Sequence, residues 1–251
     1  MDVAARERDF VRVAGPDAAD YLQRRVSNDV EVLAPGEACP ALLLTAKARV
    51  IAPLVVLRRG EEDFLLLTEP GLGEVVRSLL ARMRLRARCE VEPEEQESAL
   101  LLGGEHVGAF STDWPGAHEV LDARLEPTLG EDELERRRIE AGVPRWGSEI
   151  DERILPAEAG LDETHVSFSK GCYPGQEPVA RLHYRGHPNR GLRVVELAEL
   201  PEPDAPLLHD GREVGRVTSA ARREDGSVVA LAYVRREVPD DAPLALAARA
   251  G

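Results

Sequence analysis

The chain has 251 residues, of which 43% are apolar and 31% charged, a composition typical of a folded globular protein with room for two or three domains. Its formal net charge of −14 does not provide the basic surface that a sequence-independent nucleic-acid binder needs, so we expect no direct nucleic-acid binding. No apolar run reaches the roughly 18 residues of a membrane span, and the charged N-terminus lacks a secretory apolar segment, so we expect a cytoplasmic protein that does not engage a membrane.

The first part of the chain mixes strand and helix signals. Pro16 suits the first position of a helix, where its missing N–H costs nothing. Pro53 lies inside a strand-like run and favours an edge position or a bulge. The expected elements are a strand at 9–14, a helix from 15 to about 26, and strands at 41–44 and 50–57.

The next part, from residue 58 to about 129, shows a β-α-β alternation. A helical apolar face and several short apolar runs predict a small split α+β unit of the ferredoxin-like kind. The expected elements are a helix at 72–83 and strands at 64–67, 85–91, 99–102 and 119–125.

The remainder of the chain falls into three segments. A charged helix is expected at 132–141, with Gly142 as its left-handed cap. Residues 156–185 are expected to be largely irregular, and a long structureless stretch in a compact domain is usually functional. From Gly191 onward the pattern is all-β and predicts a small barrel or sandwich, with strands at 192–197, 213–218 and 228–234.

The most distinctive segment is Lys-Gly-Cys-Tyr-Pro-Gly-Gln-Glu at residues 170–177, called the cysteine motif below. Lys170 is one of only two lysines in a chain with 32 basic residues. A neighbouring cation favours the thiolate form of a cysteine, and flanking glycines let other groups approach the backbone. The motif therefore predicts a functional site centred on Cys172, with Lys170 assisting it.

Three roles are open to Cys172: a nucleophile or redox thiol, a ligand of a metal or cluster, or a structural residue. One thiolate does not hold an iron–sulfur cluster alone, because such clusters usually take four cysteines, so a cluster role would be transient and shared with a partner. Cys39 and Cys89 lie in apolar, strand-like contexts and are expected to fill the core. His183 and His187 have helical metal spacing, but their neighbours disfavour a helix, and we predict no metal site.

The cysteine motif resembles the signature of the YgfZ family, folate-binding relatives of the glycine-cleavage T-protein, over eight positions of which one is free. The likeness extends along most of the chain. It is carried further by residues 15–30, 138–144 and 156–170 and by Arg181 and Arg190.

This resemblance implies an α+β fold in which three domains form a ring around a channel for tetrahydrofolate or a derivative. The implied domains are a discontinuous folate-binding domain at 1–57 plus 130–190, a ferredoxin-like domain at 58–129, and a C-terminal β-barrel at 191–251. It also implies a role in the assembly or repair of iron–sulfur clusters. The partners would be a reduced folate and iron–sulfur proteins or their assembly factors, with an indirect effect on tRNA modification.

The resemblance makes Cys172 the essential residue of an accessory factor rather than of an enzyme with multiple turnover. Around it, Gln176 and Glu177 either hydrogen-bond a flat heterocycle or cap the next element, and Asn28 either contacts the pterin or closes a turn. The expected folate-binding residues are Asn28, Arg138, Glu140, Tyr173, Gln176, Glu177 and Arg181. For Arg138 and Glu140 a surface ion pair is the alternative.

Two departures from the family pattern bear on activity. Ala52 and Pro53 stand where the T-protein has the carboxylates of its aminomethyl-transfer chemistry, so that reaction loses its main catalytic group. Arg8 and Leu134 stand where some YgfZ proteins have tryptophans near the folate. A tetrahydrofolate-dependent aminomethyltransferase is therefore the second hypothesis, and a ring-shaped scaffold that has lost folate is the third.

Overall fold

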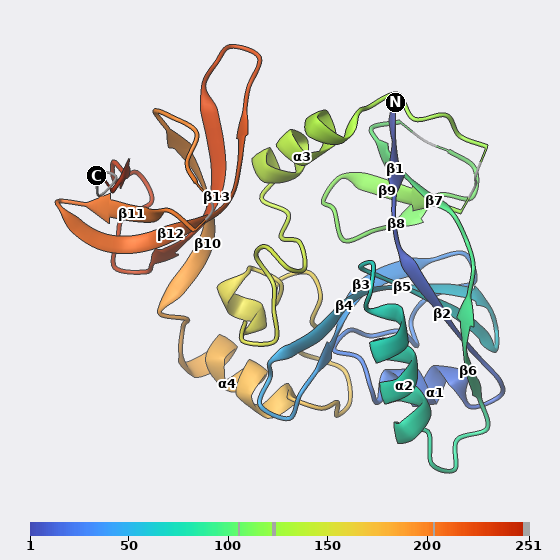
Figure 1. Cartoon of the computed structure of the whole chain (residues 1–251). Coiled ribbons are helices and arrows are strands. Elements are labelled where there is room, and N and C mark those ends of the chain that lie inside the picture. Colours follow the sequence, from blue (N-terminus) through green and yellow to red (C-terminus); the bar gives the residue numbers. More distant parts are fainter. Residues whose placement is uncertain (105, 122–123, 203, 248–251) are drawn as a thin grey trace.

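A computed structural model of the chain describes residues 1–104, 106–121, 124–202 and 204–247 (Figure 1). The described residues form three β-sheets with helices packed against them. No helix in these ranges has both the length and the apolar composition needed to cross a bilayer.

The central sheet has the strand order β3-β4-β5-β2-β6, with antiparallel neighbours throughout. Two helices follow its strands in the sequence and cover one face of it. These elements are β2 (Asp9–Ala14), α1 (Ala18–Gln23), β3 (Ala38–Leu44), β4 (Val50–Gly60), β5 (Asp63–Thr68), α2 (Gly73–Met83) and β6 (Glu90–Glu94).

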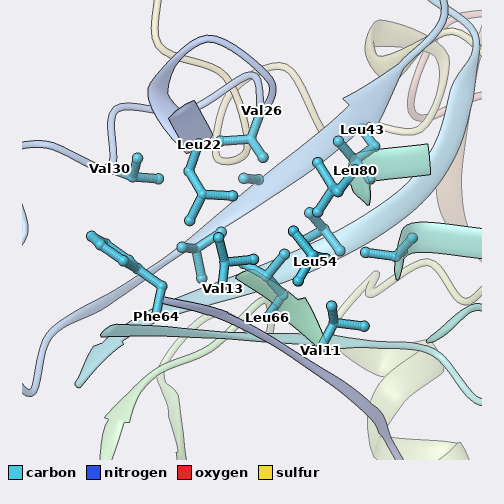
Figure 2. Close-up of a cluster of buried hydrophobic side chains, with 14 of the residues drawn as sticks. Val11, Val13, Leu22, Val26, Val30, Leu43, Leu54, Phe64, Leu66 and Leu80 are labelled. Carbon is cyan, nitrogen blue, oxygen red and sulfur yellow. The ribbon is translucent and has the colours of Figure 1, made fainter. Parts of the chain in front are cut away.

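The main core lies between this sheet and its two helices (Figure 2). Alternate residues of each strand point to opposite faces, so Leu54 of β4 and Leu66 of β5 meet Leu22 of α1 and Leu80 of α2. Their neighbours point the other way and pack with Phe110 of the second sheet. The central sheet is therefore covered on both faces, which explains the unbroken apolar runs of its strands.

The second sheet joins the N-terminal strand to later ones in the order β1-β7-β9-β8. Its strands are β1 (Asp2–Arg6), β7 (Ser98–Leu102), β8 (Phe110–Ser111) and β9 (Ala117–Val120). Strands from 58–129 thus pair with strands from 1–57 in both sheets, and the first expected domain boundary falls inside β4. The ferredoxin-like unit is not confirmed, and the three-domain division stays a prediction.

The third sheet follows the cysteine motif and has the order β10-β13-β12-β11-β14. Helix α3 (Glu131–Glu140) lies between this sheet and the other two (Figure 1), and its Ile139 packs on Val229 and Leu231. The strands are β10 (Arg190–Leu197), β11 (Pro206–His209), β12 (Arg212–Arg222), β13 (Val228–Arg235) and β14 (Ala245–Leu246). The described residues show no pairing between β10 and β14, so the expected closed barrel is not found and the sheet is open.

Four local expectations need correction. The first helix ends at Gln23 instead of Val26, and the strand expected at 85–91 is β6, at Glu90–Glu94. The stretch 156–185 is not irregular throughout, because it contains a short 3₁₀ turn and helix α4 (Gln176–Arg185). Pro53 lies in an interior strand, but one residue beyond the β4–β5 ladder, which begins at Leu54, so its missing N–H leaves that ladder intact.

Candidate functional site

The cysteine motif is fixed by its tyrosine and exposes its cysteine. Tyr173 is buried in a cluster with Leu42, Ile154 and Val179, whereas the preceding Cys172 is exposed. Cys172 and Gly171 border an open hollow of about 350 Å³ together with Asp20, Gln23, Arg24 and Glu31. The thiol is thus accessible on a loop that the buried ring holds in place.

Gly175 forms the turn from the motif into α4. Its φ of 83° lies in the left-handed region, which favours glycine. A Cβ at this position would lie 2.6 Å from the carbonyl oxygen of Thr45. Gln176 and Glu177 therefore begin α4, and Glu177 is an exposed acid in the first turn, where it suits the helix dipole.

Lys170 clamps the motif to the turn after α1. Its ammonium donates hydrogen bonds to the carbonyl oxygens of Val26, at 2.8 Å, and Asn28, at 2.6 Å. The Asn28 amide donates to the carbonyl oxygens of Pro40 and Thr164, so this side chain closes the turn, one of its two predicted roles. The structure thus brings Asn28 and the cysteine motif together.

Lys170 was predicted to favour the thiolate of Cys172, but its ammonium contacts backbone carbonyl oxygens and the Tyr173 ring instead. Among the described residues no hydrogen bond or ion pair joins it to Cys172, and its ammonium lies 5.5 Å from the centre of the Tyr173 ring. Burial lowers the pKa of Lys170 to about 8. Burial also raises the pKa of Cys39 to about 12, although Lys170 favours its thiolate. Lys170 therefore acts on the position of the motif, and Cys39 behaves as the predicted core thiol.

The histidines near the motif make other contacts. Burial lowers the pKa of His165 to about 4, so this side chain is neutral at pH 7, and its Nδ1 lies 2.8 Å from the hydroxyl of Thr164. His183 stacks on Phe168 with ring centres 3.9 Å apart. Within the described ranges, no three His, Cys, Asp or Glu side chains are arranged to hold a metal ion.

A larger cavity of about 750 Å³ lies between α3 and the first two sheets. Its walls include Trp114 and Trp146, the two tryptophans of the chain, and Leu134, Pro144 and Leu100. Its polar lining consists of Arg6, Glu7, Glu69, Glu131, Asp132, Glu135, Arg138 and Arg145. The two tryptophans were not predicted as site residues, although their rarity in the sequence was a usable signal.

A buried charge cluster lies at one side of this cavity. The guanidinium of Arg8 donates to both carboxylate oxygens of Glu119, at 3.2 and 3.0 Å, and to Asp113, at 3.0 Å. Burial opposes charge on Asp113, but Arg6 and Arg8 outweigh it and hold the pKa of this carboxyl well below its usual range. These ion pairs hold the four side chains together beside the cavity, and Arg6 is the member of the four that lines it.

The two residues of α3 that were predicted to bind folate, Arg138 and Glu140, lie in different surroundings. Arg138 is buried, lines the cavity, and donates to Glu149 at 2.9 Å and to the carbonyl oxygen of Val143 at 2.6 Å. Glu140 accepts hydrogen bonds from Arg136 and Arg223 and does not line the cavity.

The other predicted residues lie at the motif and on α4. Arg181 is exposed on α4, and no hydrogen bond or ion pair to it occurs within the described part of the chain. The predicted site therefore divides into a thiol site and a cavity, and of the predicted folate-binding residues only Arg138 lines the cavity.

The fold of the chain is similar to that of a solved aminomethyltransferase structure. The glycine cleavage system aminomethyltransferase T of Bartonella henselae superposes with a TM-score of 0.76 at 20% identity, over 91% of this chain and 76% of that one. The fold is that of the glycine-cleavage T-protein class.

Curated relatives narrow the assignment. Proteins named "tRNA-modifying protein YgfZ" from Edwardsiella ictaluri and Klebsiella pneumoniae are 28% and 27% identical, over 93% and 91% of this chain and 84% and 83% of theirs. An uncharacterized protein of Haemophilus influenzae is 26% identical over 87% of this chain and 83% of its own length. No family model matches the chain. These similarities support a YgfZ-like assignment of the chain within the T-protein fold class.

Proposed function

We propose that this protein is a cytoplasmic, folate-binding accessory factor for the assembly or repair of iron–sulfur clusters. A reduced folate occupies the 750 Å³ cavity, and Cys172 acts on the cluster or its protein. The effect on tRNA modification is indirect, through modifying enzymes that carry such clusters. The observation that carries the proposal is the exposed Cys172 on a loop anchored by buried Tyr173.

The cavity suits a reduced folate in size and chemistry. Its volume falls within the range of small-molecule sites. Trp114 and Trp146 offer aromatic faces for a flat heterocycle, which offsets the absence of tryptophan at positions 8 and 134. Arg145, whose side chain is 45% exposed, lines the cavity and would attract the glutamate carboxylates of the ligand, whereas buried Arg138 is already paired with Glu135 and Glu149. When bound, a reduced folate would supply a one-carbon carrier.

The thiol site suits a protein partner. A single thiolate cannot complete a cluster by itself, so the partner supplies the remaining ligands. Cys172 is exposed, and α4, which begins four residues later, carries the exposed side chains of Tyr184 and Arg181; within the described ranges Arg181 makes no hydrogen bond or ion pair. We infer that an iron–sulfur protein or an assembly factor docks at this surface.

Complementation and ligand binding test the proposal together. In a deletion strain, the wild type should restore cluster-dependent enzyme activity, whereas Cys172→Ser should not, although it should bind folinic acid as tightly as the wild type. Full complementation by Cys172→Ser would refute the role of the thiol. Absence of folinic acid binding to the wild type in calorimetry would refute the folate role and favour a scaffold that has lost folate.

The T-protein fold keeps a tetrahydrofolate-dependent aminomethyltransferase as the alternative. Against it, Ala52 is fully buried in the main core and the carbonyl oxygen of Pro53 accepts a hydrogen bond from Thr68, so neither position offers a base. Turnover with an aminomethylated carrier protein and tetrahydrofolate would establish the alternative.

A further inference from the structure

The charge cluster beside the cavity contains more carboxylates than cations. Arg6 and Arg8 face three acids, namely Asp113, Glu119 and Glu69. Asp113 and Glu119 take the hydrogen bonds, because both arginines donate to Asp113 and Arg8 donates to Glu119. The hydroxyls of Ser98 and Thr112 add two more bonds to Glu119, both at 2.8 Å. The third carboxylate, Glu69, has no such hydrogen bonds.

Glu69 accepts no side-chain hydrogen bond from the described residues. Its nearest cationic nitrogens are Nη1 of Arg8, at 3.6 Å, and Nη2 of Arg6, at 4.0 Å, both beyond hydrogen-bond distance. Nη1 of Arg8 is itself buried without a hydrogen-bond partner. Burial raises the pKa of Glu69 against the pull of both arginines. A desolvated carboxylate without hydrogen bonds is costly unless a ligand completes it.

The carboxylate of Glu69 lies in the wall of the cavity in which the folate is proposed to bind. Its side chain is 16% exposed and forms part of the cavity wall with Pro70 and the two tryptophans. A carboxylate has two parallel acceptor oxygens, which match a planar group that carries two adjacent N–H donors. The pterin ring of a folate carries such an edge, formed by its 2-amino group and the neighbouring ring N–H.

We propose that Glu69 recognises the amino-pyrimidinone edge of the pterin ring and thereby selects 2-amino pteridines over their oxo counterparts. The proposal rests on the folate function proposed above and adds a specificity-determining residue to it. Substituting the 2-amino group by a carbonyl would place an oxygen against the carboxylate, so the site should reject that ring. This follows the general rule that a buried polar group discriminates strongly against a ligand that leaves it unpaired.

Calorimetry with two ring systems tests the proposal. Dimethylpterin and dimethyllumazine share the same methylated bicyclic ring and carry an amino or an oxo group, respectively, at position 2, where the oxo form also has a proton on the adjacent ring nitrogen N1. The wild type should bind the pterin at least about tenfold more tightly. Glu69→Gln should weaken folinic acid and dimethylpterin binding by about 10- to 100-fold, the cost of a lost charge-assisted pair. It should also remove the preference for the amino compound, since an amide donates to a carbonyl.

A matched control is Glu135→Gln. Glu135 also lines the cavity, but it already accepts hydrogen bonds from Arg138 at 2.8 and 2.9 Å, so this variant should keep the amino preference. If folinic acid fails to bind the wild type, the folate function itself is refuted. If folinic acid binds but the wild type does not prefer the amino compound, or Glu69→Gln keeps that preference, only the role of Glu69 is overturned. The wild-type comparison decides the matter even if Glu69→Gln does not fold.

Discussion

Replacing Gly175 by alanine should destabilise the protein by an amount that the structure allows to be worked out. A residue with a Cβ pays about 1–2 kcal/mol for the left-handed region. The new Cβ would also lie 2.6 Å from the Thr45 carbonyl oxygen and 3.2 Å from the Cα of Ala48, so backbone must move. Relieving that overlap by angle distortion adds about 1 kcal/mol, for a total of about 2–3 kcal/mol.

Thermal unfolding gives the measurement, and the motif itself gives the control. For a chain of this size the change corresponds to a melting temperature lower by about 4–12 °C. At Gly171 an added Cβ would meet no atom within 4 Å, so Gly171→Ala should shift the melting temperature by less than about 2 °C. A Gly175→Ala protein as stable as the wild type, or equal losses at both glycines, would refute the argument that the turn at Gly175 needs glycine.

Three further predictions concern the thiol, the buried imidazole and the charge cluster. In the native state a maleimide should modify Cys172 first, because Cys89 is buried and Cys39 is half-buried, and in denaturant all three cysteines should react; native labelling of Cys39 or Cys89 as fast as that of Cys172 would contradict these exposures. Burial lowers the pKa of His165 from 6.5 to about 4, so the unfolded chain binds a proton that the folded chain does not, and stability should fall with decreasing pH across this window. A His165→Asn variant whose unfolding free energy keeps that pH dependence would disprove the assignment. Glu119→Gln should cost about 3 kcal/mol in denaturant unfolding, because it breaks the buried ion pair in which Arg8 donates to both carboxylate oxygens of Glu119. The exposed Glu74→Gln should change nothing measurable, and equal effects of the two substitutions would contradict this reasoning.

The regular elements of the core could be predicted from the sequence. The strand at 9–14 coincides with β2, and the helix at 72–83 begins one residue before α2, because both have apolar residues at a clear strand or helix period. Helix α4 was missed because Gly186 and Pro188 disfavour a helix around His183 and His187. The structure shows that both residues lie past the end of α4, which stops at Arg185, and that Pro178 lies in its first turn, where no intrahelical N–H bond is lost.

The cysteine motif could be singled out from the sequence, and the cavity could not. Residues 170–177 carry their chemistry in one short segment; Cys172 is exposed there, and its role stays a prediction. The cavity is built from separate segments near residues 5, 69, 114 and 145, which only the folded chain brings together. The spacing of residues in the sequence does not indicate which distant segments meet. For the same reason, the sequence did not indicate that Arg6 and Arg8 face three carboxylates, one of which is Glu69.

The bond from Lys170 to the carbonyl oxygen of Asn28 spans 142 residues of sequence. During translation, the turn after the first helix must therefore wait, without this bond, until the ribosome has released the chain through residue 170. Closing so long a loop is entropically costly, and it becomes favourable only once the intervening sheets have already drawn its ends together. The exposed thiol of Cys172 therefore reaches its final position only after the first 170 residues have been made and the sheets they form have folded.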